Sequence, residues 1–432
     1  MLPIGQLFAY GLQHVLAMYA GAVAVPLILA NALHLSQEQV IYLINADLFC
    51  AGIATIIQAI GIGPVGIKFP IMQGVTFAAV SPMILIGQEH GLTSIFGATI
   101  AAGLITYLLS PFFSRLMRFF PAVVTGTIIT IIGIALLPVA VNWAAGGNSA
   151  AANYASPANI GLAFAVLAFI LTLNKYVSGF LSNISVLLGL VFGTLLAMPL
   201  GIVDFSKVGQ ADWIGFTMPF AFGMPTFELS SILAMTVVML VVMTETTGDI
   251  IAIGQIVDKP VGAKELTRGL QTDGVATMIG GLFNSFPHTA FAQNVGLVSL
   301  TGVKSRFVVA TGGLILILFG LFPKAAAVVA AIPNPVLGGA GIVMFGMVAS
   351  SGIRALTKVN YEGNKNTLIV AVSIGVSMVP LAVPNFYHAL PEWARIVLHS
   401  GITGGTLSAI LLNAFFNEIG KLKLKKTLEK VA

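Results

Sequence analysis

The residues best suited to chemistry lie between Asn284 and Arg306, in the stretch NSFPHTAFAQNVGLVSLTGVKSR. This stretch carries two adjacent amides, Gln293 and Asn294, together with a histidine and several hydroxyl groups. Long apolar segments flank it on both sides. Because an unpaired polar group in lipid costs several kcal/mol, such a stretch persists at membrane depth only inside protein or along a cavity. The sequence therefore predicts a polar pocket inside an apolar protein.

Two carboxylates form a second group of candidates, in the apolar segment VVMTETTGDIIAIG. Glu245 and Asp249 are four residues apart, so they share one face of a helix. Two ionised carboxylates in one apolar helix are costly, and at least one should hold a proton or have a partner. We interpret Glu245 as a substrate ligand and proton site. Asp249 is either a proton site or a buried hydrogen-bonding residue.

Four further polar residues fall in apolar segments. Asp273, in RGLQTDGVATMIGG, is either a proton site or a helix N-cap near the cytoplasmic surface. His14, in GLQHVLAMYAG, is either a structural hydrogen-bonding residue or a substrate contact. His288 follows Pro287 and is expected to order a break in the helix. Asp47 has no obvious partner in the sequence.

Several kinds of site are not predicted. The histidines and acids lack metal-ligand spacing, and Cys50 is the only cysteine, so we expect no metal and no disulfide. Neither a glycine-rich phosphate loop nor an HExxH helix is present. An enzyme would need an activated nucleophile or a metal. The sequence therefore predicts a protein without cofactors that is not an enzyme.

The composition indicates the class of protein that holds these residues. The chain has 432 residues, 57% of them hydrophobic and only 8% charged, whereas about a quarter are charged in soluble domains. This is typical of an all-α polytopic membrane protein. The net charge of +5 comes from loop residues and does not indicate a nucleic-acid partner. The start, MLPIGQ, lacks the basic region of a signal peptide, so the first apolar segment should remain as a span.

Twelve apolar runs are long enough for spans, and two polar, interrupted stretches, 66–86 and 286–303, are ambiguous. Cytoplasmic loops collect Lys and Arg. If both stretches cross, 17 Lys and Arg residues face the cytoplasm and 3 face outside, whereas the ratio is 12 to 8 if neither crosses. The charges therefore predict fourteen transmembrane segments with both termini in the cytoplasm.

Matching landmarks indicate an internal repeat. Phe69-Pro70 corresponds to Phe286-Pro287, and Pro121 to Pro333, at separations of 217 and 212 residues. Two halves of seven spans must enter the membrane from opposite sides, so the repeat is inverted. The prolines predict short extended breaks in spans 3 and 10, which place free helix N-termini near the bilayer centre. The walls of the pocket should be residues 73–77 and 291–294.

The polar groups of this pocket suit one kind of solute. Gln293 and Asn294 offer donors and acceptors, Glu245 accepts, and Phe77 and Phe291 offer flat faces. This set matches a planar heterocycle with N–H and C=O groups. It suits an inorganic anion poorly, because no Arg or Lys is expected at midplane depth.

These motifs together resemble the nucleobase/ascorbate transporter family. Gln293-Asn294-Val295-Gly296, followed by Thr301, is similar to its signature, and the resemblance extends over QGVTFAAVSP, TETTGD and TDG. It implies fourteen spans in two inverted repeats, a homodimer, and a core domain that slides against a gate domain. The core would comprise 1–116 (spans 1–4) and 228–325 (spans 8–11), and the gate 117–204 (spans 5–7) and 332–420 (spans 12–14), before a basic tail at 421–432.

The resemblance also implies roles for individual residues. Glu245 would accept from substrate N–H groups, and Gln293 would read the polar edge of the ring, where uracil carriers have glutamate. Asp273 would take part in proton coupling, with Asp249 as a further candidate. The remaining substrate-site positions are Phe77, Thr76, Ala292, Phe291, Asn294 and His14.

We therefore expect proton-coupled uptake of uric acid, xanthine or both across a bacterial inner membrane. The segments GFGMP and NWAAGG resemble bacterial uric acid permeases. Gly302 departs from the arginine of close urate carriers, and Asp249 is more similar to xanthine carriers. A uracil permease and an anion carrier of the same fold remain the alternatives.

Overall fold

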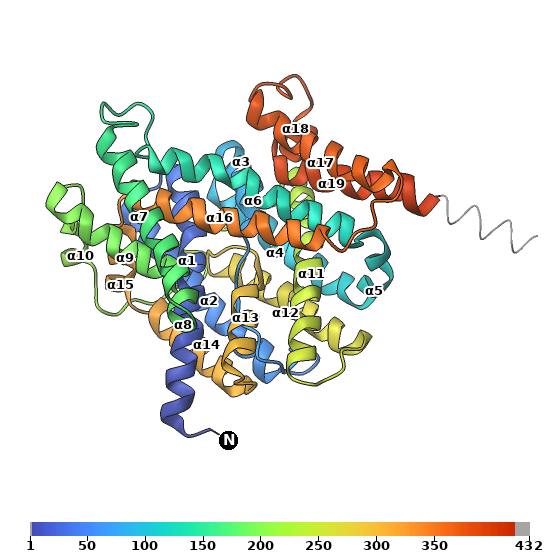
Figure 1. Cartoon of the computed structure of the whole chain (residues 1–432), viewed down its shortest axis with the longest axis horizontal. Helices are drawn as coiled ribbons and strands as arrows, with labels where there is room; N and C mark the ends of the chain where they lie inside the picture. Colours follow the sequence, from blue (N-terminus) through green and yellow to red (C-terminus); the bar gives the residue numbers. More distant parts are fainter. Residues whose placement is uncertain (1, 420–432) are drawn as a thin grey trace, which may run out of the picture.

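The computed structural model describes residues 2–419 as a helical bundle with one short sheet (Figure 1). The expected tail at 421–432 lies outside the described residues. The helices before residue 211 are α1 (Ile4–Ala32), α2 (Gln37–Ile60), α3 (Val80–His90), α4 (Leu92–Leu109), α5 (Phe113–Leu116), α6 (Ala122–Ala144), α7 (Pro157–Tyr176), α8 (Phe180–Asn183), α9 (Ser185–Ala197) and α10 (Ser206–Gln210).

The rest of the chain adds α11 (Leu229–Ile256), α12 (Ala263–Leu282), α13 (Ala292–Thr301), α14 (Arg306–Gly320), α15 (Pro323–Ala330), α16 (Asn334–Leu356), α17 (Asn364–Ala382), α18 (Glu392–His399) and α19 (Gly401–Asn413). The strands are β1 (Gln73–Val75) and β2 (His288–Ala290), and they pair with each other. A 3-10 turn, η1 (Phe77–Ala79), connects β1 to α3. The prediction of an all-α polytopic fold with short extended breaks is confirmed.

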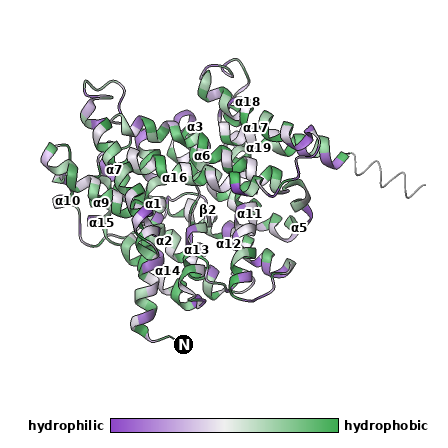
Figure 2. Ribbon diagram, viewed as in Figure 1, coloured by the Kyte–Doolittle hydropathy of each residue, from purple (hydrophilic) through white to green (hydrophobic). Residues whose placement is uncertain are grey.

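Eight helices in residues 2–419 are long and apolar enough to cross a membrane. They are α1, α2, α4 extended to Phe112, α6, α7, α11, α16 and α17. A ninth is possible if α14 and α15, bent by 81°, form one broken span. Hydrophobic residues run along most of these helices (Figure 2). The count of fourteen spans stays a prediction, because it includes the short helices α3 and α13.

Helix starts follow local sequence signals. Ser36 precedes α2 and forms a capping box, in which the Gln39 backbone N–H donates to Ser36 Oγ at 3.3 Å. The Ser36 backbone N–H donates in turn to Gln39 Oε1 at 2.9 Å. Ser156 caps α7, whose first residue is Pro157. Proline suits this position because its missing N–H would have no partner inside the helix.

Helices α6 and α16 lie alongside each other across the middle of the bundle (Figure 1). Glycines let their backbones approach closely. A Cβ at Gly338 would lie 2.1 Å from the backbone nitrogen of Ala144, and one at Gly133 would lie 2.3 Å from that of Ala349. In lipid, helices associate through such close packing rather than through hydrophobic burial. These glycines therefore set the distance between α6 and α16.

The helix contacts repeat between the two halves of the chain. Helix α2 packs on α14 as α12 packs on α4, α1 packs on α14 as α11 packs on α4, and α7 packs on α9 as α17 packs on α19. In each of these pairs of contacts, the helices of one contact are the counterparts of the helices of the other: α1 corresponds to α11, α2 to α12, and α4 to α14. The antiparallel pairing of β1 with β2 runs the two halves in opposite directions. Both features are those of an inverted repeat.

Candidate functional site

The two chain breaks meet at the β1–β2 sheet. Its register pairs Gln73 with Ala290 and Val75 with His288. Two flanking backbone bonds extend the pairing, from Thr76 N–H to the Pro287 carbonyl at 2.9 Å and from Phe291 N–H to the Met72 carbonyl at 3.0 Å. Each extended segment thus satisfies backbone groups of the other, which is what allows non-helical backbone deep in a membrane protein.

A helix begins directly after each strand. The Thr76 side chain caps η1 by accepting from the Ala78 N–H at 3.1 Å, and α3 continues from Val80. Phe291 is the N-cap residue of α13. The strands are antiparallel, so η1 and α13 begin at opposite ends of this short sheet and leave it in opposite directions. Helix N-termini carry partial positive charge, which favours electron-rich groups of a bound molecule.

Asp273 forms a buried polar pair with Gln73. Gln73 Nε2 donates to Asp273 Oδ1 at 2.9 Å, and both side chains are fully buried. Gln73 is also held through its backbone, because its N–H donates to Thr55 Oγ1 at 2.9 Å. Helix α12 begins at Ala263, so Asp273 lies in its middle. The alternative interpretation of Asp273 as an N-cap near the surface was wrong: the polar residues of AKELTRG form the first turns of α12, and the helix starts earlier than expected.

Asn294 and His14 form the second buried polar pair. Asn294 Nδ2 lies 3.0 Å from His14 Nδ1 and donates to the His14 backbone carbonyl at 2.9 Å. His14 is 2% exposed and Asn294 is fully buried. The structure therefore brings together α1 and α13, which are about 280 residues apart in the sequence. His14 has a defined structural partner, and its ring holds the amide that follows Gln293.

The carboxylates of α11 are more accessible than these pairs. Glu245 and Asp249 are half-buried, one turn apart, and within the described residues neither forms a hydrogen bond or an ion pair. Helix α11 packs on β2, η1 and α13. The neighbouring Thr246 fixes α11 to the sheet, because its Oγ1 accepts from the Ala290 N–H at 3.3 Å.

Gln293 and Ala292 begin α13 and are exposed, whereas Thr76, on the other side of the sheet, is buried. The exposed amide of Gln293 therefore remains available to a ligand. Gln293 is the first polar side chain after the N-cap of α13, so the helix terminus and the amide act at the same place.

The two expected aromatic walls differ. The Phe77 ring is half-buried and meets the ring of Phe345 edge to face, with centroids 5.7 Å apart and an interplanar angle of 80°. Phe291 is only 4% exposed, and its ring fills the space beside Gly74 and Gly21. Phe291 therefore supports the site by packing. Phe345, in α16, was missed by sequence reasoning, because a lone Phe in an apolar helix carries no signal of its contacts.

Two polar residues left open by the sequence acquire partners. Asp47, fully buried in α2, accepts from Ser285 Oγ at 2.9 Å. The ring of His288 lies with Nδ1 2.7 Å from the Phe286 carbonyl, in agreement with the interpretation that it orders the break. Both contacts lie in or next to the segment between α12 and β2.

The polar groups of this site lie on elements that pack against one another, because α11 contacts β2, η1 and α13. Buried pairs fix the backbone, while Glu245, Asp249 and Gln293 keep polar groups available. Such groups can bind a polar ring through directional hydrogen bonds, and a solute that leaves them unpaired is disfavoured.

The chain is similar to known permeases. The Permease family model matches residues 5–386. The chain is 53% identical over 421 residues to the uric acid transporter UacT of Escherichia coli (strain K12), which covers 96% of this chain and 87% of that protein. It is 43% identical over 419 residues to a xanthine permease of Bacillus subtilis (strain 168), covering 97% of this chain and 95% of the relative.

Among solved structures, the transmembrane domain of the cyanobacterial bicarbonate transporter BicA has a TM-score of 0.60 at 15% identity. The match covers 95% of this chain and 98% of that domain, and it shows the same fold. The family match and the apolar helices make this chain a multi-pass membrane transport protein rather than an enzyme. With its motifs, its broken helices and these relatives, the chain belongs to the nucleobase/ascorbate transporter family of permeases.

Proposed function

We propose that this protein carries a purine base, uric acid or xanthine or both, into the cell by symport with protons. The observation that carries the proposal is the site at the β1–β2 sheet, where an unpartnered Glu245 and an exposed Gln293 lie on elements that pack against each other. The relatives named as uric acid and xanthine transporters support the choice of solute. A purine has the N–H and C=O groups that this pair requires.

In the proposed binding mode, the Glu245 carboxylate accepts from ring N–H groups and the Gln293 amide pairs with the opposite polar edge. The backbone N–H groups at the start of α13 and the ring of Phe77 complete the contacts. The Asn294–His14 and Gln73–Asp273 pairs hold the two breaks in register. A base whose N–H and C=O groups do not match Glu245 and Gln293 would leave a buried donor or acceptor unsatisfied. This costs about 1–3 kcal/mol for each group and would give the site its selectivity.

We further propose that the chain works as a core domain (1–116 and 228–325) that moves against a gate domain (117–204 and 332–420). The helix contacts support this division, since α2 packs on α14 and α4 on α12, while α6 packs on α16 and α7. The substrate site is built from core elements, and Phe345 is a gate residue that touches it. A homodimer in the bacterial inner membrane, with both termini in the cytoplasm, completes the proposal.

Proton coupling is assigned to the carboxylates around the site. Asp273 is buried against Gln73, and Asp249 lies one turn after Glu245 on α11. Rearranging a site with one buried and two half-buried carboxylates is costly in a low-dielectric interior when they are ionised. Binding one proton together with the base lowers that cost. The loaded core then moves and releases both on the cytoplasmic side.

Uptake of radiolabelled xanthine, competed by unlabelled urate or uracil with and without a protonophore, tests this function. We expect competition by urate and loss of uptake when the proton gradient collapses. Competition by uracil alone would refute the purine assignment. The variant Gln293→Glu provides the matched control, because it introduces the residue of uracil carriers and should weaken purine competition.

A further inference from the structure

We propose that Glu89 and Arg395 form a latch between the core and gate domains, which closes the outer face of the transporter and opens in every transport cycle. This inference rests on the proposed function and its division into domains. It adds a contact outside the substrate site that controls which side of the membrane the site faces.

The latch is an ion pair between segments about 300 residues apart. Arg395 Nη2 donates to Glu89 Oε2 at 2.8 Å. Glu89 lies in the last turn of α3, within the core, and Arg395 lies in α18, between the gate helices α17 and α19. Helix α18 packs on both α3 and α11. The two side chains are 35% and 37% exposed, so the pair is partly shielded from water.

A second polar contact joins the same domains. Asn31, near the end of α1, donates through Nδ2 to Asn334 Oδ1 at 3.3 Å, and Asn334 Nδ2 donates to the Gly146 carbonyl at 3.2 Å. The next residue, Gly147, has a φ of +83°, and a Cβ there would lie 2.2 Å from Asn334 Nδ2. The glycine at the end of the segment NWAAGG therefore lets the loop after α6 approach the Asn334 side chain closely. In the predicted topology, this contact and the latch both lie at the outer face.

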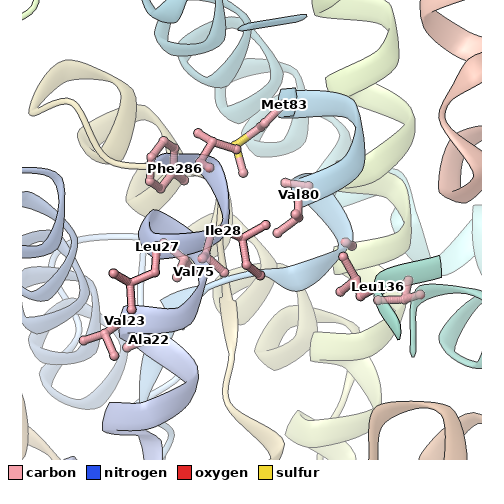
Figure 3. Close-up of a cluster of buried hydrophobic side chains, with 14 of the residues drawn as sticks. Ala22, Val23, Leu27, Ile28, Val75, Val80, Met83, Leu136 and Phe286 are labelled. Atoms are coloured by element: carbon pink, nitrogen blue, oxygen red, sulfur yellow. The ribbon is translucent and has the colours of Figure 1, made fainter. Parts of the chain in front are cut away.

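Apolar side chains close the path beneath these contacts. Ile28 of α1, Val80 and Met83 of α3, and Leu136 of the gate helix α6 belong to one buried cluster, and each is at most 1% exposed (Figure 3). Gln293, at the start of α13, is exposed by contrast. With the proposed topology, we infer that the site is covered on the latch side and reached from the cytoplasmic side, which is an inward-facing state.

An ion pair this exposed to water shifts the equilibrium between the inward-facing and outward-facing states only moderately. Breaking one shifts a two-state population by roughly two- to fivefold. The apolar cluster and the Asn31–Asn334 contact add to the closure. Removing the latch therefore favours the outward-facing state without abolishing the cycle.

External labelling of a buried reporter tests the latch without any substrate. Met83→Cys, in a Cys50→Ser background, places a thiol in the sealed cluster. We expect Glu89→Gln to raise its rate of labelling by an impermeant thiol reagent about two- to fivefold. The exchange of Glu89→Arg with Arg395→Glu should restore the slow rate. An unchanged rate in Glu89→Gln would overturn the proposal.

Cross-linking provides the second measurement, with a matched control in the same chain. Glu89→Cys with Arg395→Cys, bridged by a short bis-methanethiosulfonate that forms a disulfide with each thiol and releases sulfinate, should stop uptake until a reductant cleaves the disulfides. Asp258→Cys with Lys304→Cys replaces an ion pair of 2.6 Å that lies within the core, so bridging it should leave uptake unchanged. Full uptake with the latch pair bridged would refute the latch. If the unmodified protein carries neither base, the proposed function fails, while the labelling rates still decide the latch.

Discussion

Replacing Asp273 by Asn should separate proton coupling from the structure of the site. The carboxylate accepts a hydrogen bond from Gln73 Nε2 at 2.9 Å, and both side chains are fully buried. An Asn side chain keeps an oxygen at the same position, so the hydrogen bond to Gln73 persists. It cannot take up or release a proton in the physiological range. We therefore expect Asp273→Asn to bind and exchange substrate but not to accumulate it against a gradient.

Two other substitutions test how much the Gln73–Asp273 hydrogen bond contributes to the structure of the site. Asp273→Ala leaves Gln73 Nε2 buried without its acceptor, and Gln73→Leu leaves the Asp273 carboxylate without its donor. A hydrogen bond to a charged group contributes about 1.5–3 kcal/mol. Since about 1.4 kcal/mol corresponds to a factor of ten, apparent substrate affinity should fall roughly ten- to a hundredfold in both variants. Asp273→Asn should change it by less than about threefold, since it keeps the bond.

The assay uses purified protein in liposomes and compares two modes of transport. Counterflow of labelled substrate needs no proton gradient and should survive in Asp273→Asn. Accumulation driven by an inward proton gradient should be lost. The reasoning would be refuted if Asp273→Asn accumulated substrate as the unmodified protein does, because the coupling proton would then bind elsewhere. Loss of counterflow as well would refute the claim that Asn preserves the site.

Three further predictions concern other parts of the molecule. Glu245→Gln should lower uptake by about a hundredfold because it removes the charged acceptor for ring N–H groups, with normal membrane insertion; full uptake would exclude that role. Asn294→Ala should lower the free energy of unfolding by about 1–3 kcal/mol, because it leaves the buried His14 ring without its partner. Its melting temperature in detergent should therefore fall, whereas that of Gln293→Ala, at an exposed position, should not. Gly338→Ala should destabilise the protein by about 1–3 kcal/mol through overpacking against Ala144, while Gly346→Ala, in the same helix with open space around it, should melt like the unmodified protein; equal melting of these two variants would contradict the packing argument.

Local and compositional features are readable in this sequence because they depend on near neighbours. The low share of charged residues indicates a membrane bundle, since lipid tolerates few charges. Pro70 and Pro287 indicate the breaks of β1 and β2, because proline lacks the N–H that a helix needs. Glu245 and Asp249 share a helix face through their spacing alone. The Gln293-Asn294 motif identified the family by resemblance, and the family match confirms it.

The helix boundaries around Asp273 could not be read in the same way. The first turns of α12 are polar, so an apolar run marks only the part of the helix after them. Hydropathy therefore places Asp273 at the start of the helix, whereas the backbone places it in the middle. The hydrogen-bond partner of Asp273 could not be predicted either, because Gln73 lies 200 residues away in the sequence.

The membrane class, the broken spans, the repeat of landmarks and the residue types of the site can be predicted without a structure. The partners of the polar residues become visible in the packed bundle: Gln73 with Asp273, Asn294 with His14, Asp47 with Ser285, and Glu89 with Arg395. The physical reason is that spacing and composition act within one helix, whereas these pairs form between helices far apart in the chain. Their geometry follows from how the two halves pack against each other.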